Sequence, residues 1–342
     1  MVCAECRENY RGQAVSSKNT LVTGGAGYIG SHVVLALQDA GHSVSVIDNL
    51  STGHASAIPS DVPFLESDLS ESEAVEAFMR LNKTTNVLHF AAHTQVGESV
   101  VDPEKYYRNN TFNTLKLVDA CKRVGVERFI FSSTAAVYGE VGLEPVQETA
   151  AKMPVSPYGW SKLFSEQMIS DMCRAHQMSW VALRYFNVAG ADPQGRAGQS
   201  TPEATHLIKV ACEVALGLRD SLKIFGSDYP TPDGTGVRDY IHVSDLADAH
   251  LAALEYLEAG AESLAVNCGY GRGYSVKQVL DVLAKIANGP VKTETVARRR
   301  GDAASVVANA GLIREKLDWR PVHNDLEHII TTAYRWEQRK TS

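Results

Sequence analysis

A tyrosine and a lysine stand four positions apart in the segment SPYGWSK, as Tyr158 and Lys162. On a helix, residues at this spacing share one face, so the Lys162 ammonium could favour ionisation of the Tyr158 phenol. The ordinary pKa of tyrosine is about 10, and a tyrosine whose pKa is lowered toward neutrality can act as a base. The pair therefore predicts proton abstraction by Tyr158, assisted by Lys162.

A run of hydroxyl residues, FSST, precedes this pair and ends at Thr134. The short side chain of Thr134 could hydrogen-bond a substrate oxygen beside Tyr158 as charge moves there. A loop that satisfies its own backbone groups with serine and threonine is the alternative. We expect Thr134 to be the third catalytic residue.

Three glycines near the N-terminus, Gly24, Gly27 and Gly30, follow one another at intervals of three, unlike the GxGxxG spacing of standard dinucleotide-binding loops. Glycines permit a tight turn and close approach of the backbone to a pyrophosphate, which then lies at the positive end of the next helix. A plain strand-to-helix turn is the alternative. An apolar strand before the loop and a helix after it favour nucleotide binding.

Asp48 ends the second predicted strand, 18 residues after Gly30. A carboxylate at that place can accept hydrogen bonds from the ribose hydroxyls of an adenosine, although a turn aspartate is the alternative. Residues 49–53 contain no arginine to receive a 2′-phosphate, and the Asp48 carboxylate would repel one. NAD is therefore favoured over NADP.

Strands and helices alternate along the first half of the chain. Strands are predicted at 20–22, 44–47, 62–65, 87–90, 129–131 and 180–183, with helices at 71–81, 104–124, 158–175 and after the glycine loop, where Gly41 ends the helix. This alternation predicts an α/β fold with a Rossmann-type, doubly wound parallel sheet.

The texture of the sequence changes after residue 188, where a Gly/Pro loop opens a more irregular region. That region mixes helices at 245–257 and 275–286 with short strands, which is typical of a smaller, mixed α/β substrate-binding lobe. We expect a polar extension at 1–18, an NAD-binding Rossmann domain at 19–188 and a substrate-binding domain at 189–342.

Composition and charge exclude several functions. The net charge of −7 argues against a general affinity for nucleic acid, and no segment has the apolar length of a signal peptide or a membrane span. Arg298, Arg299 and Arg300 form a local basic run, either a solvated loop or a place for a diphosphate. Six scattered cysteines, including an isolated CxxC at Cys3 and Cys6, predict a reducing, cytoplasmic setting and no metal site.

The chain resembles the extended short-chain dehydrogenase/reductases, and among them the UDP-galactose 4-epimerases, from about residue 20 to residue 336. The resemblance rests on the ordered segments TGGAGYIGSH, HFAAHTQVGESV, FSSTAAVYG, SPYGWSK, LRYFNVAGADP, IFGSDYPTPDGTGVRDYIHVSDLADAH and RRRGD. It implies bound NAD, a UDP-sugar substrate, a 4-keto intermediate, and a homodimer formed through the helices at 104–124 and 158–175.

The resemblance also implies site residues. The catalytic residues would be Tyr158, Lys162 and Thr134. The cofactor contacts would be Gly24, Gly27, Tyr28, Ile29, Gly30, Asp48, Asn49, Asp68, Leu69, Phe90, Ala91, Asn109, Tyr158, Lys162, Tyr185 and Phe186. The substrate contacts would be Thr134, Tyr158, Asn187, His206, Arg238, Arg299, Asp302 and Val306. Taken singly, many of these have ordinary structural alternatives, such as core packing for Leu69 and Phe90 or a surface Arg–Asp pair for Arg238.

Departures from the family pattern bear on the reaction and its substrate. Related dehydratases carry an acidic pair where this chain has Ala135 and Ala136, so elimination would lack its acid and base. Thr94 replaces a lysine that contacts the NAD pyrophosphate in some members, and His206 stands in a segment that replaces an asparagine pair. Val306 is smaller than the tyrosine of glucose-only members, which predicts room for a 2-acetamido group.

Two other functions stay open on the sequence alone. One is a 4-epimerase of a different nucleotide sugar, such as UDP-glucuronate or a UDP-pentose. The other is an NAD-binding regulator without catalysis, against which the intact Tyr158, Lys162 and Thr134 argue.

Overall fold

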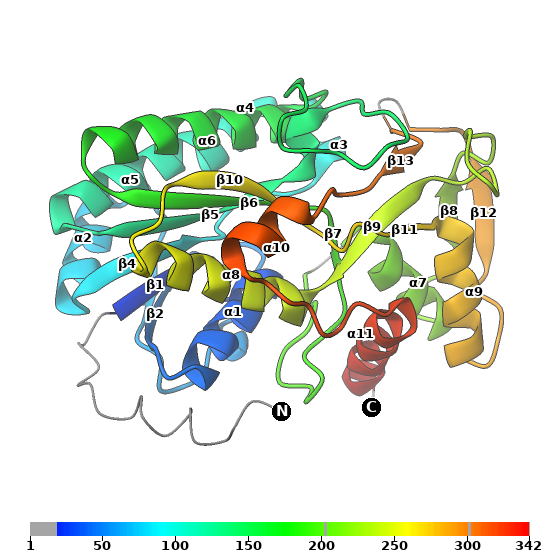
Figure 1. Cartoon of the computed structure of the whole chain (residues 1–342). Helices are drawn as coiled ribbons and strands as arrows, with labels where there is room; N and C mark the ends of the chain where they lie inside the picture. The colour runs from blue at the N-terminus through cyan, green and yellow to red at the C-terminus, as the bar shows by residue number, and fades with distance from the viewer. Residues whose placement is uncertain (1–18, 202–203, 300–301, 342) are drawn as a thin grey trace, which may run out of the picture.

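The computed structural model describes residues 19–201, 204–299 and 302–341. A seven-stranded sheet, all of whose pairings are parallel, forms one side of the molecule (Figure 1). In the order β10-β6-β5-β4-β1-β2-β3, its strands are Leu264–Cys268, Ser179–Tyr185, Arg128–Thr134, Thr84–His89, Asn19–Thr23, Ser43–Asp48 and Phe64–Glu66. The strand order reverses between β1 and β4, and ligands of such sheets bind at the carboxyl ends of the strands beside this point.

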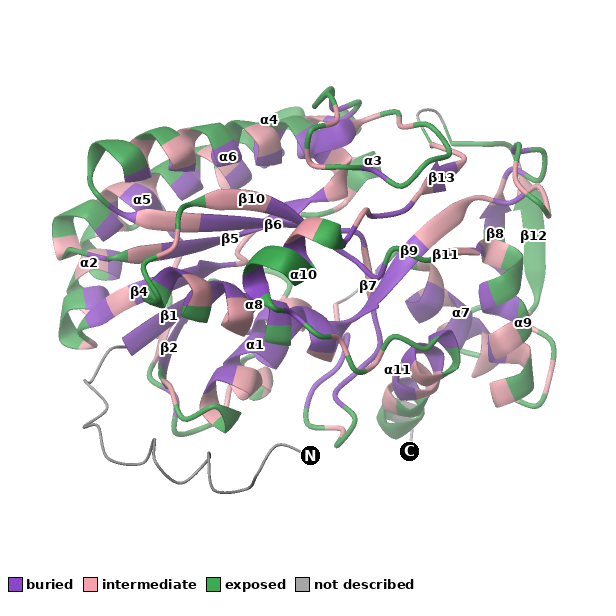
Figure 2. Ribbon diagram, viewed as in Figure 1, coloured by how far each residue is buried: buried purple, intermediate pink, exposed green. Residues whose placement is uncertain are grey.

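Helices cover both faces of the sheet, and the core lies between them and the strands (Figure 2). Apolar residues of α1 (Tyr28–Asp39) and α8 (Val243–Glu258) belong to one core cluster. Those of α2 (Ser72–Leu81), α5 (Asn113–Val124) and α6 (Pro157–Ala175) belong to the other. Strands buried on both faces explain the continuous apolar runs of the sequence, and the predicted doubly wound α/β fold is confirmed.

A smaller lobe stands beside the sheet (Figure 1). Its strands β7 (Asn187–Ala189), β9 (Val237–His242), β11 (Gly273–Ser275) and β13 (Ser305–Val306) form one sheet, and β8 (Leu222–Phe225) pairs with β12 (Thr293–Val296). Helices α7 (Leu207–Ala215), α9 (Val276–Ile286) and α11 (Leu326–Thr341) belong to the same part, and α10 (Gly311–Leu317) packs on α8 and β10. The lobe is mixed α/β, as its sequence texture predicts.

The expected domain boundary at residue 188 does not separate all of the chain into the two parts of the molecule. Helix α8 and strand β10 lie beyond that point in the sequence, yet α8 covers the large sheet and β10 is its edge strand, paired with β6. Residue 188 therefore marks only the first place where the chain passes from the large sheet to the smaller lobe. The expected extension at 1–18 lies outside the described residues.

The helix expected at 104–124 is interrupted. After α3 (Val96–Val101) comes α4 (Pro103–Tyr106), then a π-helical segment, η3 (Tyr107–Phe112), and only then α5. Asp102 caps α4 by accepting a hydrogen bond from the Lys105 amide, with Pro103 in the first position. The wider π turn occurs where Asn110 reaches out of the helix toward its neighbours, as π segments often do near functional sites.

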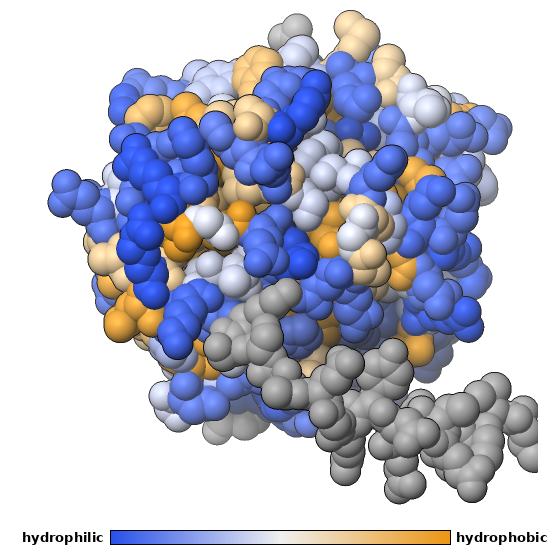
Figure 3. All heavy atoms as spheres, turned by 60° about the vertical axis from the view of Figure 1, so that its left-hand side comes forward, coloured by the Kyte–Doolittle hydropathy of each residue, from blue (hydrophilic) through white to orange (hydrophobic). Residues whose placement is uncertain are grey.

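The surface seen in Figure 3 is largely polar, and the described cysteines form no disulfide. The face in Figure 3 is mostly hydrophilic, with apolar side chains in separate patches. Cys121, Cys173, Cys212 and Cys268 are free and buried, whereas Cys3 and Cys6 lie outside the described residues. In the part of the chain that the structure describes, no helix is long and apolar enough to cross a membrane, and no cluster of His, Cys, Asp or Glu side chains could hold a metal ion.

Candidate active site

The glycine loop joins β1 to α1 at the switch point of the sheet. Gly24 has a φ of +73°, and a Cβ there would lie 2.6 Å from the backbone nitrogen of Ala91, which follows β4. A Cβ on Gly30 would lie 2.1 Å from the Gly24 carbonyl oxygen. Glycine is therefore required at both positions, because the loop folds tightly against β4 and against its own helix.

Helix α1 begins without a side-chain cap and has no acidic residue in its first turn. The Tyr28 hydroxyl donates to the Gly190 carbonyl at 2.7 Å, and Ile29 packs against the core. Both side chains are thus engaged elsewhere, and the backbone N–H groups of the first turn are the donors that this loop offers an anion.

Asp48, at the end of β2, ties this strand to the glycine loop. Its carboxylate accepts hydrogen bonds from the Ala26 amide at 3.0 Å and the Leu50 amide at 2.8 Å. Burial raises the pKa of Asp48, and these two hydrogen bonds oppose the rise. Each carboxylate oxygen keeps a lone pair that a ribose hydroxyl could use.

Asn49 and Asp68 lie beside Asp48 and are hydrogen-bonded to each other. Asn49 follows β2, and Asp68 follows the neighbouring strand β3. The Asn49 amide donates to Asp68 at 2.9 Å, and Asn113 of α5 donates to the other Asp68 oxygen at 3.1 Å. Burial acts to raise the pKa of Asp68, but hydrogen bonds from Ser70, Asn49 and Asn113 outweigh it, so the net pKa is lowered. The structure thus groups Asp48, Asn49 and Asp68 at one edge of the sheet.

The remaining residues expected around the cofactor differ in exposure. Leu69 is buried in the core, so only its backbone can reach a ligand, whereas Phe90 and Ala91 are half-buried. The Phe90 ring stacks at a tilt on His250, with centroids 4.7 Å apart. Asn109 is half-buried and donates to Asn110 at 3.0 Å.

Tyr158, Thr134 and Lys162 are brought together at the end of β5. The Thr134 hydroxyl adjoins the Tyr158 phenol, and the Lys162 ammonium donates to the Ser132 carbonyl at 2.8 Å. Burial raises the pKa of Tyr158, which the Thr134 contact opposes, and burial lowers the pKa of Lys162 to about 7, which Glu166 opposes. Assembly of the trio agrees with the sequence, but the protein alone leaves Tyr158 protonated, contrary to a simple effect of the i,i+4 ammonium.

Sequence reasoning missed several residues that hold this trio. Asn110 donates to the His93 carbonyl at 2.9 Å and to the Ser161 hydroxyl at 3.1 Å, which ties η3 to α6. Ser132 contacts the Tyr185 hydroxyl as well as Lys162. Their signal in the sequence is weak, because each is a small polar residue whose partner is distant along the chain.

The small sheet of the second lobe collects several expected substrate residues. Asn187 of β7 pairs with Tyr240 of β9, and Val306 of β13 pairs with Arg238, also of β9. Val306 packs on the cluster that contains Phe186, so it adjoins the end of the large sheet. Residues far apart in sequence are therefore neighbours here because β9 pairs with both strands.

The two arginines and the aspartate expected near the nucleotide lie in this lobe as well. Arg238 is mostly buried and forms an ion pair with Asp302 at 3.4 Å, while the Arg299 guanidinium lies 3.7 Å from the centroid of the Phe225 ring. Asp239 is fully buried and accepts the amides of Tyr270 and Gly271, so Arg238 and Asp239 are not a surface pair. Arg300 lies outside the described residues.

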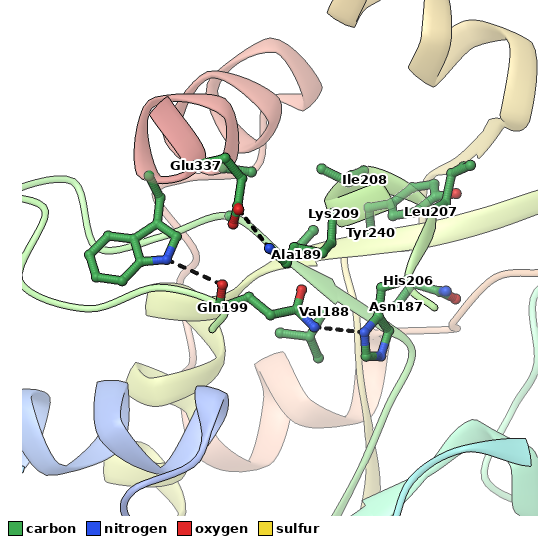
Figure 4. A pocket seen from close by; sticks show the side chains of 13 residues that line it. Asn187, Val188, Ala189, Gln199, His206, Leu207, Ile208, Lys209, Tyr240 and Glu337 are labelled. Carbon is green, nitrogen blue, oxygen red and sulfur yellow. Dashed lines mark hydrogen bonds and ion pairs between the residues drawn. The ribbon is translucent and has the colours of Figure 1, made fainter. Parts of the chain in front are cut away.

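Asn187 and His206 line one pocket, to which β7, α7, β9 and α11 also contribute residues (Figure 4). The Nδ1 of His206 is 2.7 Å from the Gln199 amide nitrogen, and burial lowers the pKa of His206, so its ring is neutral near pH 7. A neutral His206 lacks the charge to pair with a phosphate and can offer it only a hydrogen bond. Its expected role as a substrate contact stays a prediction.

Comparison with known proteins identifies the family. Residues 20–269 match the model of the NAD dependent epimerase/dehydratase family. This chain belongs to that family. A UDP-glucose 4-epimerase of Azospirillum brasilense is 53% identical over 326 residues, which cover 95% of this chain and 94% of the relative.

This chain is similar to solved structures of epimerases over almost its whole length. The structure of UDP-glucose 4-epimerase from Brucella ovis in complex with NAD has a TM-score of 0.91 at 44% identity, covering 93% of this chain and 98% of that one. The UDP-Glc/GlcNAc 4-epimerase of Campylobacter jejuni has a TM-score of 0.83 at 46% identity, covering 94% and 99%. The family relation therefore holds for both parts of the molecule.

Proposed function

We propose that this chain is a UDP-glucose 4-epimerase, which interconverts UDP-galactose and UDP-glucose through a 4-keto sugar with NAD as a bound cofactor. Proteins of that name are its relatives from several bacteria at 43–53% identity. The observation that carries the proposal is the contact of Tyr158 with Thr134 and the position of Lys162 beside them, at the end of β5. Ala135 and Ala136, which follow directly, bring no carboxyl group for elimination.

The residues present fit NAD. The uncapped N-terminus of α1 can receive the pyrophosphate, and the tight turn at Gly24 and Gly30 removes the side chains that would hold it off. Asp48 keeps lone pairs for the adenosine ribose and has no arginine nearby in sequence for a 2′-phosphate. When bound, NAD supplies the acceptor, and later the donor, of the hydride at C4 of the sugar.

The protein's own part in the reaction is proton transfer and holding. Tyr158, as phenolate, takes the proton of the sugar 4-hydroxyl, while Thr134 hydrogen-bonds the same oxygen. Asn187, Arg238 and Arg299 hold the nucleotide diphosphate in the second lobe, where guanidinium groups suit phosphate oxygens. The keto sugar, tethered only through its nucleotide, would turn its other face to the cofactor site. Return of the hydride to C4 on that face would invert the configuration, while Tyr158 gives the proton back to the 4-oxygen.

The reaction is tested by its stoichiometry. Purified protein with UDP-galactose should produce UDP-glucose without net NADH, measured by chromatography of the nucleotide sugars and by absorbance of the cofactor. Accumulating NADH would indicate a dehydrogenase, and a stable keto product would indicate a dehydratase. Absence of any turnover with NAD bound would favour a regulator.

We further propose that acetamido sugars are substrates. Val306 is half-buried against Phe186 and Ala308, and its short side chain leaves more space there than a tyrosine would. The Campylobacter jejuni protein, at 46% identity, is described as acting on UDP-Glc and UDP-GlcNAc. Turnover of UDP-GlcNAc and UDP-GalNAc by the purified protein is the direct test, and its absence beside good UDP-galactose turnover would refute this proposal.

A homodimer is the oligomeric state that we propose. Four aromatic side chains, Tyr107, Phe112, Trp160 and Phe164, are each between 37% and 47% exposed on η3 and α6, and Trp160 stacks on Phe164. Exposed aromatic residues in one patch are typical of protein interfaces. A cytoplasmic location is proposed on the four free, buried cysteines, and cell fractionation would test it.

A further inference from the structure

Three consecutive residues at the end of β5 each adjoin a different turn of α6. Thr134 lies beside Tyr158, the Ser132 carbonyl accepts a hydrogen bond from Lys162, and the Ser133 hydroxyl donates to Glu166. Glu166 follows Lys162 by four positions, as Lys162 follows Tyr158, so all three lie on one face of the helix. Glu166 therefore lies one helical turn beyond Lys162, on the same face of α6 as Tyr158 and Lys162.

Glu166 is 5% exposed and is paired with Arg184, which is 3% exposed on β6. The Arg184 Nε donates to one carboxylate oxygen at 2.9 Å, and its terminal nitrogen donates to the other at 2.6 Å. A buried ion pair contributes little net stability, since desolvation offsets much of its attraction, and apolar residues would often serve as well. The position of this pair, one turn from Lys162, favours a role in the reaction.

The pair is itself held in place by hydrogen bonds from the far side. Arg184 donates to the Tyr138 hydroxyl at 3.0 Å, and Tyr138 donates to Asn267 of β10 at 2.7 Å. Asn267 in turn donates to the Val146 carbonyl at 2.8 Å. This chain of hydrogen bonds, which runs from Arg184 through Tyr138 and Asn267, restrains the arginine and with it the Glu166 carboxylate.

Few of the groups that face Tyr158 and Lys162 carry charge near pH 7. Burial lowers the pKa of His89 to about 3 and raises the pKa of both neighbouring tyrosines, so all three are neutral. The facing groups are His89 on β4, Tyr106 on α4, Tyr185 on β6, and Glu166 on α6 itself, which is paired with Arg184. Among them, Glu166 is the one that carries negative charge next to Lys162.

We propose that Glu166 is a positioning residue for the epimerase reaction, which fixes the register of α6 on β5 and keeps Lys162 charged beside Tyr158. The inference rests on the proposed function. The three contacts between β5 and α6 fix the position of the helix along the strand. The buried Glu166 carboxylate stabilises the charged form of Lys162, because the two groups lie one helical turn apart.

The test is the variant Glu166→Gln, measured as the holoenzyme with UDP-galactose across pH. Removing an anion lets both Lys162 and Tyr158 lose protons at lower pH, so both limbs of the kcat profile should move toward acid, the Lys162 limb by about one pH unit. Lys162 is nearer than Tyr158 and should shift more, which makes the form with charged lysine and ionised tyrosine rarer. We expect maximal kcat to fall by about tenfold or more, with KM changed by less than about twofold.

A merely structural role would lower kcat without moving the limbs. The matched control is Glu76→Gln in α2, which breaks the ion pair with Arg123 (2.8 Å) on the opposite side of α5 and should change neither the limbs nor kcat. If Glu166→Gln does not fold, the double variant Glu166→Gln/Arg184→Gln replaces the pair with neutral amides. The acid shift should persist there, because Glu166 is the charged partner nearer to Lys162.

The possible results distinguish failure of the role proposed for Glu166 from failure of the proposed epimerase function. An active parent enzyme and a folded Glu166→Gln variant with coinciding pH limbs would overturn the role of Glu166 alone, whatever the variant's kcat. A parent that binds NAD but does not epimerise any UDP-sugar would overturn the proposed function, and this inference with it.

Discussion

At the scale of single residues, Tyr158, which we propose as the base, is buried. Burial raises the pKa of Tyr158 and lowers the pKa of Lys162 to about 7, so the protein alone keeps Tyr158 protonated and leaves Lys162 only partly charged near pH 7. Coupled groups of this kind share their protons, and added positive charge nearby would favour the phenolate. The oxidised nicotinamide carries such a charge, so in the proposed mechanism bound NAD would favour ionisation of Tyr158.

Tyr158→Phe should reduce kcat for UDP-galactose by at least about a thousandfold, because it removes the proton acceptor and leaves the aromatic ring in place. The bound NAD content should match that of the parent protein. Turnover by coupled assay and NAD content by absorbance after denaturation provide the check. A variant that keeps a tenth of the parent kcat would exclude Tyr158 as the base.

Val306→Tyr should narrow the range of sugars. A tyrosine at this place would occupy the space beside Phe186 and Ala308 that we assign to the acetamido group. The kcat/KM for UDP-GalNAc should fall by about tenfold or more, while that for UDP-galactose stays within about threefold. Val306→Ala is the control and should keep both activities; equal losses for both sugars in the tyrosine variant would argue against a role in selection.

At the scale of elements, the loop between β1 and α1 combines two constraints on glycine. Gly24 needs a positive φ and also has no space for a Cβ, since Ala91 lies against it. Gly41, which ends α1, needs a positive φ of 81° but has open space around it. Comparing these two positions separates the cost of backbone conformation from the cost of collision.

Gly41→Ala should therefore destabilise the protein by about 1 kcal/mol through its conformation alone. Gly24→Ala should cost about 1–3 kcal/mol more, because β4 and the loop must move apart. It should also weaken NAD binding, which Gly41→Ala should not do. Urea unfolding and NAD titration measure the two effects, and equal destabilisation by both variants would contradict the close approach to Ala91.

At the scale of the whole molecule, the two parts are joined by more than one crossing of the chain. Helix α8 and strand β10 return to the large sheet between segments of the smaller lobe. Hydrogen bonds also connect the parts, as between Tyr28 and the Gly190 carbonyl at 2.7 Å. The proposed sites for cofactor and nucleotide would thereby be held in one framework, which suits the proposed reaction, in which only the sugar turns.

Phe164→Glu should shift the protein toward the mass of one chain. The substitution places a charge in the aromatic patch of η3 and α6, where a dimer would have to bury it. Leu218→Glu is the control, because Leu218 is about equally exposed, at 51% against 47%, but lies after α7 in the smaller lobe. Sedimentation measures both; an unchanged mass for Phe164→Glu beside a dimeric parent would place the interface elsewhere.

The sequence by itself determined the local features: the alternating elements of the first half, the glycine loop, and the four-residue spacing of Tyr158 and Lys162. Each is set by neighbours along the chain, through side-chain periodicity and the backbone freedom of glycine. Only the tertiary structure decided that β10 completes the large sheet and that β9 unites Arg238, Asn187 and Val306. It also decided that Glu166 faces Arg184, because pairing between distant segments depends on packing that no local pattern records.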